Sequence, residues 1–217
     1  MLELIFGRHG ETDFNKQKKA MGQLDIPLNK NGLIQAQEVA DSLGKFKFDA
    51  ILSSDLARCL TGAKLHAGKY QALEVKPDAV WRERNYGGHA GKRLEELGYA
   101  SDSQVGDYKH FYECDCPNGE NMNSFAQRVV RAIQTAYDSH PNQRAMLHTH
   151  GGVISIAINY LLGEEYKFEN ARVHKNGFVS YLKLERHGEN LNVVDSLLNV
   201  PCSQLVLYLR HKPWDYA

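Results

Sequence analysis

The stretch Leu2-Glu3-Leu4-Ile5-Phe6-Gly7-Arg8-His9-Gly10-Glu11-Thr12 places a mostly apolar run directly before an Arg-His pair. The apolar run predicts a buried strand, and the polar residues mark the point where that strand ends. In α/β proteins, ligands bind at the carboxyl ends of such strands. An imidazole beside a guanidinium offers a nucleophile next to an anion-binding group. Residues 8–12 are therefore a candidate phosphate site, although an ordinary charged surface turn has the same local pattern.

Strand and helix patterns alternate along the first part of the chain. After a turn at residues 29–32, apolar residues recur at helical spacing up to Gly44, and a short strand follows at 48–52. Ser53-Ser54-Asp55 then predicts the cap of a second helix, because such side chains accept hydrogen bonds from the first amides of a helix. This order favours a three-layer α/β/α fold with a mostly parallel central sheet.

The regular pattern is interrupted at about residues 84–120, a segment rich in glycine, aromatic and acidic residues. Long segments without periodicity inside a compact domain are usually lids or binding loops, with a decorative insertion as the alternative. Helical spacing returns at 125–137, a strand follows at 145–147, and a strongly apolar helix at 153–162. Alternating residues at 179–184 and 191–194 predict a hairpin that gives the sheet one antiparallel edge strand.

Composition restricts the class of protein. The 217 residues are 42% hydrophobic and 24% charged, which predicts one globular domain over residues 1–217. Lys+Arg and Asp+Glu balance at 26 each, so we expect no nucleic-acid partner. No apolar run suits a signal peptide or a membrane span, and we expect a cytoplasmic protein with no membrane partner. Cys114 and Cys116 lack the second pair typical of structural zinc, and we expect no metal or cofactor.

A second histidine stands at a second strand end. His150-Gly151-Gly152 opens the apolar helix at 153–162, and the free amides of a helix N-terminus bind anions. Phosphoryl transfer through histidine needs a nucleophile, cations around the phosphoryl oxygens and a proton donor for the leaving group. We assign the nucleophile to His9, the cations to Arg8 and Arg58, and a further donor to His150. Glu83, just before the irregular segment, is the best-placed acid and base.

Five blocks in this order resemble the histidine phosphatase superfamily, which contains the cofactor-dependent phosphoglycerate mutases and the fructose-2,6-bisphosphatases. The blocks are Arg8 to Thr12 with Asn15, Gly22, Asp25, Pro27, Leu28 and Gly32; Ser53 to Leu56 with Arg58; Glu83 with Tyr86-Gly87; Pro117 with Gly119-Glu120; and His150 to Gly152, followed by Asn176 in a late turn.

The resemblance implies a phosphoglycerate mutase-like fold and a role for each matched residue. His9 would be phosphorylated during turnover, and Glu83 would be the acid and base. The phosphate pocket would consist of Arg8, Asn15, Gly22, Arg58, His150 and the Gly151 amide. The implied function is a metal-independent phosphomonoesterase, a histidine acid-type phosphatase acting through a phosphohistidine on a small phosphorylated metabolite. Residues 14–16, 82–87 and 91–94 are particularly similar to the fructose-2,6-bisphosphatase branch, which implies a sugar or glycerate bisphosphate. Other branches of the family act on ribazole phosphate or phosphoproteins, so the substrate class stays open.

Two other functions remain as alternatives. One is a phosphoglycerate mutase, which must exclude water from its phosphoenzyme until the phosphoryl group is transferred. The segment at 84–120 is shorter than the insertion that mutases typically carry, which favours hydrolysis. A non-catalytic binding module with the same fold is less consistent with the joint presence of His9 and Glu83. A homodimer is compatible with the sequence.

The sequence departs from the family pattern in four places. Met21 stands where many relatives have a polar residue, Asn121 replaces a serine, and Thr61-Gly62 replaces a Gln-Thr pair. His148 stands in place of an apolar strand residue, and we expect it to be a buried, hydrogen-bonded group.

Overall fold

The computed structural model describes residues 1–97, 116–167 and 170–212, and the larger part of the predicted lid, residues 98–115, lies outside this range. Six strands form one sheet in the order β3-β2-β4-β1-β5-β6. The strands are β1 (Leu2–Arg8), β2 (Ala50–Ser53), β3 (Val75–Pro77), β4 (Gln143–Thr149), β5 (Val179–His187) and β6 (Asn190–Val200). The helices are α1 (Asp13–Lys16), α2 (Lys30–Leu43), α3 (Ala57–Ala67), α5 (Met122–Ser139), α6 (Gly151–Leu161) and α7 (Cys202–Leu209), with 3₁₀ turns at Ala79–Trp81, Gly87–His89 and Glu95–Leu97.

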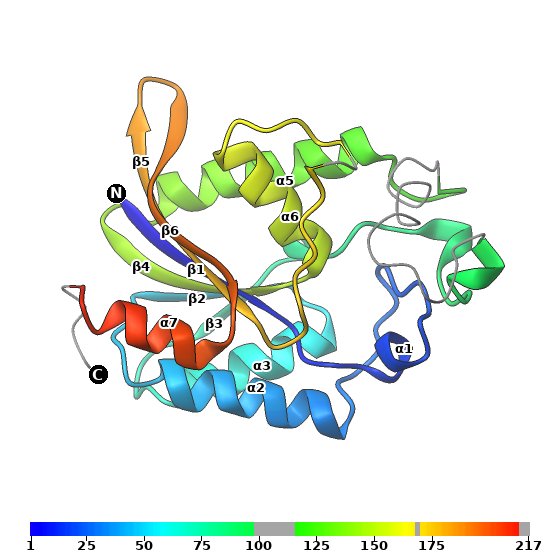
Figure 1. Cartoon of the computed structure of the whole chain (residues 1–217), viewed down its shortest axis with the longest axis horizontal. Coiled ribbons are helices and arrows are strands. Elements are labelled where there is room, and N and C mark those ends of the chain that lie inside the picture. Colours follow the sequence, from blue (N-terminus) through cyan, green and yellow to red (C-terminus); the bar gives the residue numbers. More distant parts are fainter. Residues whose placement is uncertain (98–115, 168–169, 213–217) are drawn as a thin grey trace.

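Helices cover both faces of the sheet, with α5 and α6 on one face and α2, α3 and α7 on the other (Figure 1). Successive strand residues point to opposite faces. In β1, Leu4 and Phe6 pack in the core with α5 and α6, whereas Ile5 packs in the second core with α2 and α7. Burial on both faces explains why the three successive residues from Leu4 to Phe6 are all apolar, and the predicted three-layer α/β/α fold is confirmed.

Strand pairing decides which strand ends meet. β1 lies between β4, which is parallel to it, and β5, which is antiparallel. Arg8 is in register with Thr149, and the His9 amide donates to the Thr149 carbonyl at 3.0 Å. The segments that follow β1 and β4 therefore begin side by side. β5 and β6 form the predicted hairpin at the sheet edge.

The cap predicted for α3 is wrong. Leu56 occupies the N-cap position without a side-chain hydrogen bond, and the Ala57 amide instead donates to Asp25 Oδ1 at 2.7 Å. Asp55 forms a two-point ion pair with Arg82, and Ser54 contacts His150. Asp55 and Ser54 therefore contact distant segments of the chain, whereas Ser53 Oγ donates to the neighbouring Ser54 carbonyl.

Neither β3 nor α7 was predicted.

In the described ranges, no helix is long and apolar enough to cross a membrane.

Candidate active site

A pocket of about 200 Å³ lies at the carboxyl ends of β1 and β4. Seven of the eight predicted site residues line it: Arg8, His9, Asn15, Gly22, Arg58, Glu83 and His150. The eighth, Gly151, lies against the Arg8 side chain: a Cβ on Gly151 would be 3.4 Å from the guanidinium carbon of Arg8. The structure therefore brings together residues that lie far apart in the chain.

His9 is buried with a defined ring orientation. Its Nδ1 lies 2.7 Å from the Gly10 carbonyl oxygen, which can only accept a hydrogen bond. Nδ1 therefore carries the proton, and Nε2 has a free lone pair. Burial, followed by the charges of Arg58 and Arg8, lowers the pKa of His9 well below its usual range. The imidazole is neutral near pH 7, as a nucleophile must be.

Arg58, on the first turn of α3, is almost fully buried. Its Nη1 and Nη2 donate to the carbonyls of Leu24 and Gly22, each at 2.7 Å, and its Nε donates to His150 Nδ1 at 3.3 Å. Gly22 has φ of +52°, a conformation that favours glycine, and this turn directs its carbonyl at Arg58.

The tautomer of His150 follows from its neighbours. Arg58 Nε can only donate, so His150 Nδ1 accepts and Nε2 carries the proton, 2.9 Å from Ser54 Oγ. Burial and then the Arg58 charge lower the pKa of His150, which keeps it neutral. Its ring meets that of His9 edge to face, with centroids 5.3 Å apart.

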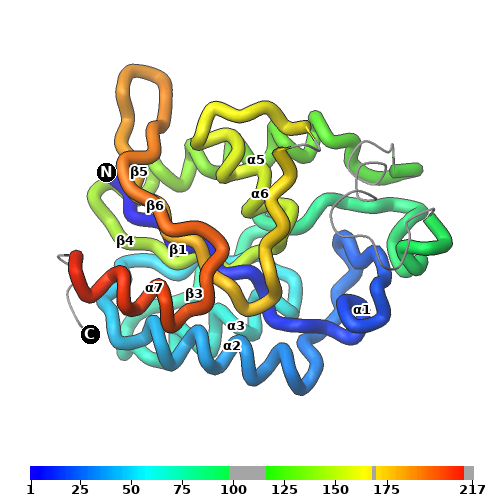
Figure 2. Tube along the Cα trace, viewed as in Figure 1, coloured from blue at the N-terminus to red at the C-terminus, as the bar shows by residue number. Residues whose placement is uncertain are grey.

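Two further contacts fix the end of β1. Arg8 Nη1 donates to the His174 carbonyl, and Asn176 Nδ2 donates to the His9 carbonyl at 3.0 Å. Figure 2 shows the chain between α6 and β5 passing this strand end. Asn15 Oδ1 accepts from the Thr12 amide at 3.1 Å, so the amino group of Asn15 is the part of its side chain that can donate to an anion.

Glu83 is held by two backbone amides. Its Oε1 accepts from the Arg84 amide at 2.9 Å and its Oε2 from the Gly152 amide at 3.0 Å. A Cβ on Gly152 would lie 2.2 Å from Glu83 Oε1. The absence of a side chain at Gly152 therefore makes room for the Glu83 carboxylate.

Three departures from the family pattern have structural explanations. Asn121 caps α5 by accepting from the Ser124 amide at 2.8 Å, as a serine could. Gly62 makes room for His148, whose Nδ1 would lie 3.3 Å from a Cβ at that position. His148 Nε2 lies 3.4 Å from His66 Nδ1, in accord with the predicted buried, hydrogen-bonded group.

At the fourth departure, Met21, the sulfur accepts from Thr12 Oγ1 at 3.7 Å. The Met21 side chain lines the pocket without offering a hydrogen-bond donor to a phosphate.

Lys18 and Lys19 also line the pocket, and sequence analysis did not single them out. They follow α1, and Lys18 has φ of +52°, which no pattern in the sequence signals. Among the described residues that line the pocket, these two lysines and Arg8 and Arg58 are cationic, and Glu83 alone carries a carboxylate. Such a pocket favours anions, and a neutral imidazole within it can attack an electrophilic phosphorus.

Known proteins match both the sequence and the fold. The sequence profile of the histidine phosphatase superfamily (branch 1) matches residues 4–196. Two Arabidopsis thaliana proteins are similar over 158 residues, 70% of this chain: phosphoglycerate mutase-like protein 4, 39% identical over 67% of its length, and metal-independent phosphoserine phosphatase, 31% identical over 65%. The fold is similar to the crystal structure of Entamoeba histolytica phosphoserine phosphatase in complex with 3-phosphoglyceric acid, with a TM-score of 0.73 and 29% sequence identity. The match covers 90% of this chain and 96% of that chain. The profile match over most of the chain, together with the shared fold, places this protein in the histidine phosphatase superfamily.

Proposed function

We propose that this phosphatase-family protein is a metal-independent phosphomonoesterase that works through a phosphohistidine at His9. The orientation of His9 carries the proposal, because Nδ1 is held by the Gly10 carbonyl and Nε2 has its lone pair free in a cationic pocket. In the first step Nε2 bonds to phosphorus as the ester P–O bond breaks, and protonated Glu83 gives its proton to the leaving oxygen. In the second step the oxygen of a water molecule bonds to phosphorus as the Nε2–P bond breaks, the Glu83 carboxylate accepts a proton from that water, and inorganic phosphate and neutral His9 are released.

The substrate class we propose is a small metabolite with a second anionic group, such as a sugar or glycerate bisphosphate. Arg8 and Arg58 lie beside His9, while Lys18 and Lys19 offer two more cations to the same pocket. A volume of about 200 Å³ suits a small phosphorylated molecule. The relatives named phosphoserine phosphatase, one of them bound to 3-phosphoglyceric acid, support phosphorylated acids as the nearest chemical class. The similarity to the fructose-2,6-bisphosphatase branch stays a prediction.

Phosphoglycerate mutase remains the second candidate, because the relative that is 39% identical is named mutase-like. A mutase returns the phosphoryl group of its phosphoenzyme to a second hydroxyl, whereas a phosphatase delivers it to water. Conversion of 3-phosphoglycerate to its 2-isomer, faster than phosphate release, would identify a mutase.

The test of the proposed function is His9→Ala assayed with 4-nitrophenyl phosphate in the presence of a metal chelator. We expect loss of turnover with an unchanged circular dichroism spectrum. His187→Ala, at an exposed position on β5, is the matched control and should keep full activity. Turnover by His9→Ala would exclude the phosphohistidine mechanism. A panel of sugar bisphosphates, phosphoglycerates, phosphoserine, nucleotides and phosphopeptides would then define the substrate class of the wild type.

A further inference from the structure

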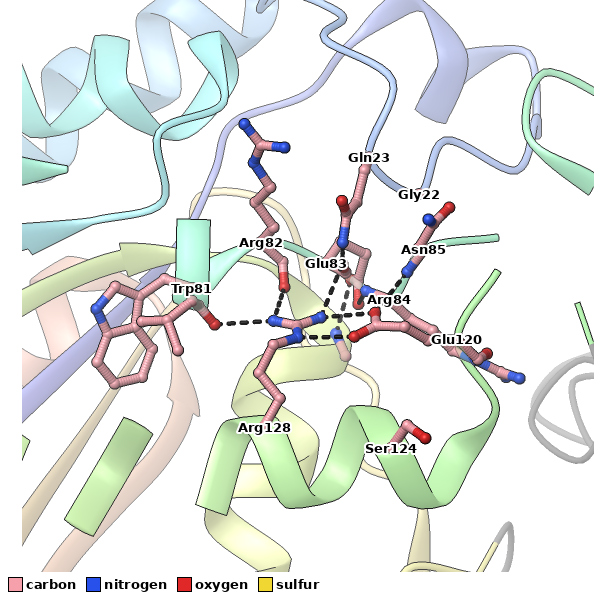
Figure 3. A network of polar contacts seen from close by, with 12 residues as sticks. Gly22, Gln23, Trp81, Arg82, Glu83, Arg84, Asn85, Glu120, Ser124 and Arg128 are labelled. Atoms are coloured by element: carbon pink, nitrogen blue, oxygen red, sulfur yellow. Dashed lines mark hydrogen bonds and ion pairs between the residues drawn. The ribbon is translucent and has the colours of Figure 1, made fainter. Parts of the chain in front are cut away.

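One side chain of α5 contacts three backbone carbonyls of the segment from Val80 to Asn85, which carries Glu83. Arg128 Nη1 donates to the carbonyls of Val80 and Arg82, each at 2.8 Å, and Nη2 donates to the Glu83 carbonyl at 3.3 Å. Figure 3 shows the Arg128 guanidinium reaching from α5 to this segment. After the 3₁₀ turn at Ala79–Trp81, the residues from Arg82 to Tyr86 belong to no helix or strand. Their backbone geometry therefore depends on such contacts.

Glu120 fixes the direction of the guanidinium. Arg128 Nε and Nη2 donate to the two Glu120 carboxylate oxygens at 2.8 and 2.7 Å, a two-point pair whose side chains are 18% and 22% exposed. The Asn85 amide donates to the same carboxylate at 2.8 Å. Burial acts to raise the pKa of Glu120, but the hydrogen bonds from Arg128 and Asn85 outweigh it and hold the pKa below its usual value. The carboxylate is thus the stable form at neutral pH.

The backbone around Glu83 is also tied from the other side. Gln23 Nε2 donates to the Glu83 carbonyl at 2.9 Å, and Gln23 follows directly on the pocket residue Gly22. The carboxylate itself is held by the Gly152 amide at the start of α6. Arg128 and Gln23 thus set the backbone from which the Glu83 side chain reaches α6, and a shift of that backbone moves the carboxylate relative to His9.

We infer that Arg128 is a positioning residue for catalysis, which, together with Glu120, fixes the Glu83 backbone so that its carboxyl group can reach the oxygen of the leaving group. This inference rests on the proposed function, because it assumes that Glu83 protonates that oxygen. Among the described residues, Arg128 does not line the pocket, and the role assigned to it is to position Glu83. A misplacement of about 1 Å in such a group is enough to slow a reaction strongly.

The test compares kcat/KM of Arg128→Lys for phenyl phosphate and 4-nitrophenyl phosphate. The two esters are similar in size, but phenolate needs protonation to leave readily, whereas 4-nitrophenolate does not. The value of kcat/KM reports formation of the phosphoenzyme and does not include its hydrolysis. Lysine keeps the charge but cannot form the two-point pair and the carbonyl contacts together. We expect a loss of about tenfold or more for phenyl phosphate and of less than about threefold for the nitrophenyl ester.

Two further variants separate positioning from folding. Arg144→Lys is the matched control, because Arg144 forms a similarly buried pair with Glu3, 2.8 Å long, at the opposite end of β4. It should leave both rates unchanged. If Arg128→Lys does not fold, Arg128→Met combined with Glu120→Gln removes the pair without leaving a lone half-buried charge, and the same selective loss is expected.

In a Glu83→Gln background, Arg128→Lys should not change the ratio of the two rates further, because the group that it positions is already gone. Equal losses for the two esters, or an additional change of their ratio in the Glu83→Gln background, would overturn the positioning role. Failure of the wild type to hydrolyse either ester would instead overturn the proposed function.

Discussion

Replacing Gly152 with alanine tests the contact between α6 and the proposed proton donor. The new Cβ would lie 2.2 Å from Glu83 Oε1 and 3.0 Å from its carboxyl carbon. Non-bonded heavy atoms do not approach this closely, so the carboxylate must retreat by about 1 Å. The retreat breaks its 3.0 Å hydrogen bond from the residue 152 amide. The side chain is flexible at its end, and we expect it to move while α6 stays in place.

The expected magnitudes separate activity from stability. A displacement of about 1 Å costs on the order of 10²-fold in rate, equivalent to about 2.7 kcal/mol of transition-state stabilisation. For stability, alanine gains up to about 1 kcal/mol in helix propensity, and the lost hydrogen bond costs about 1 kcal/mol. The free energy of unfolding should therefore change by less than about 1 kcal/mol, which is about 2–4 °C in Tm for a domain of this size.

The assay measures kcat/KM for phenyl phosphate and 4-nitrophenyl phosphate, together with thermal unfolding. Gly68→Ala is the control, because that residue has φ of −60° and its Cβ would meet the nearest atoms at 3.5 Å. We expect Gly152→Ala to lose about 10²-fold on phenyl phosphate, with Tm nearly unchanged. A phenyl phosphate rate within twofold of wild type would refute the assignment of Glu83 as the held donor. A large fall in Tm would refute the reasoning that only the side chain moves.

Three further predictions concern other residues. Gly22→Ala should destabilise the fold by about 1–2 kcal/mol in urea unfolding, because its φ is +52° and a Cβ would lie 2.9 Å from the Tyr86 ring; an unchanged midpoint would contradict this. Glu83→Gln should lower kcat/KM for phenyl phosphate by about 10²–10⁴-fold, and for the nitrophenyl ester much less, whereas equal losses would argue against proton donation. Burial, followed by the Lys69 charge, lowers the pKa of His66 from 6.5 to about 4. As the pH falls below 6.5, the unfolded chain therefore binds a proton at this residue before the folded chain does. The contribution of the neutral histidine to the free energy of unfolding is present above pH 6.5 and is lost as the pH falls toward 4. The free energy of unfolding should fall by roughly 2 kcal/mol between pH 7 and pH 5 because of this residue, and His66→Gln should reduce the measured pH dependence by that amount. An unchanged pH dependence in His66→Gln would contradict a neutral, buried His66.

Much of the fold could be predicted because local patterns report burial. The apolar run before Arg8 is a strand covered on both faces. The periodic segment 125–137 lies within α5, and the segment 153–162 ends at the C-cap residue of α6. By contrast, β3 has only three residues, one of them proline, and α7 has eight, too few for a clear period.

The sequence by itself predicted the main residues of the candidate site and the histidine phosphatase family. His9, Arg58 and His150 each stand next to a strand or helix end within a short motif, so their types and positions could be recognised one segment at a time. Only the tertiary structure decided which partners orient them. The register of Arg8 with Thr149, the clearance that Gly152 gives Glu83 and the contacts of Arg128 with the Glu83 segment all join residues far apart in the chain. Such contacts depend on how the helices and strands pack against one another. A local pattern of residue types does not indicate which residue, tens of positions away, becomes the partner.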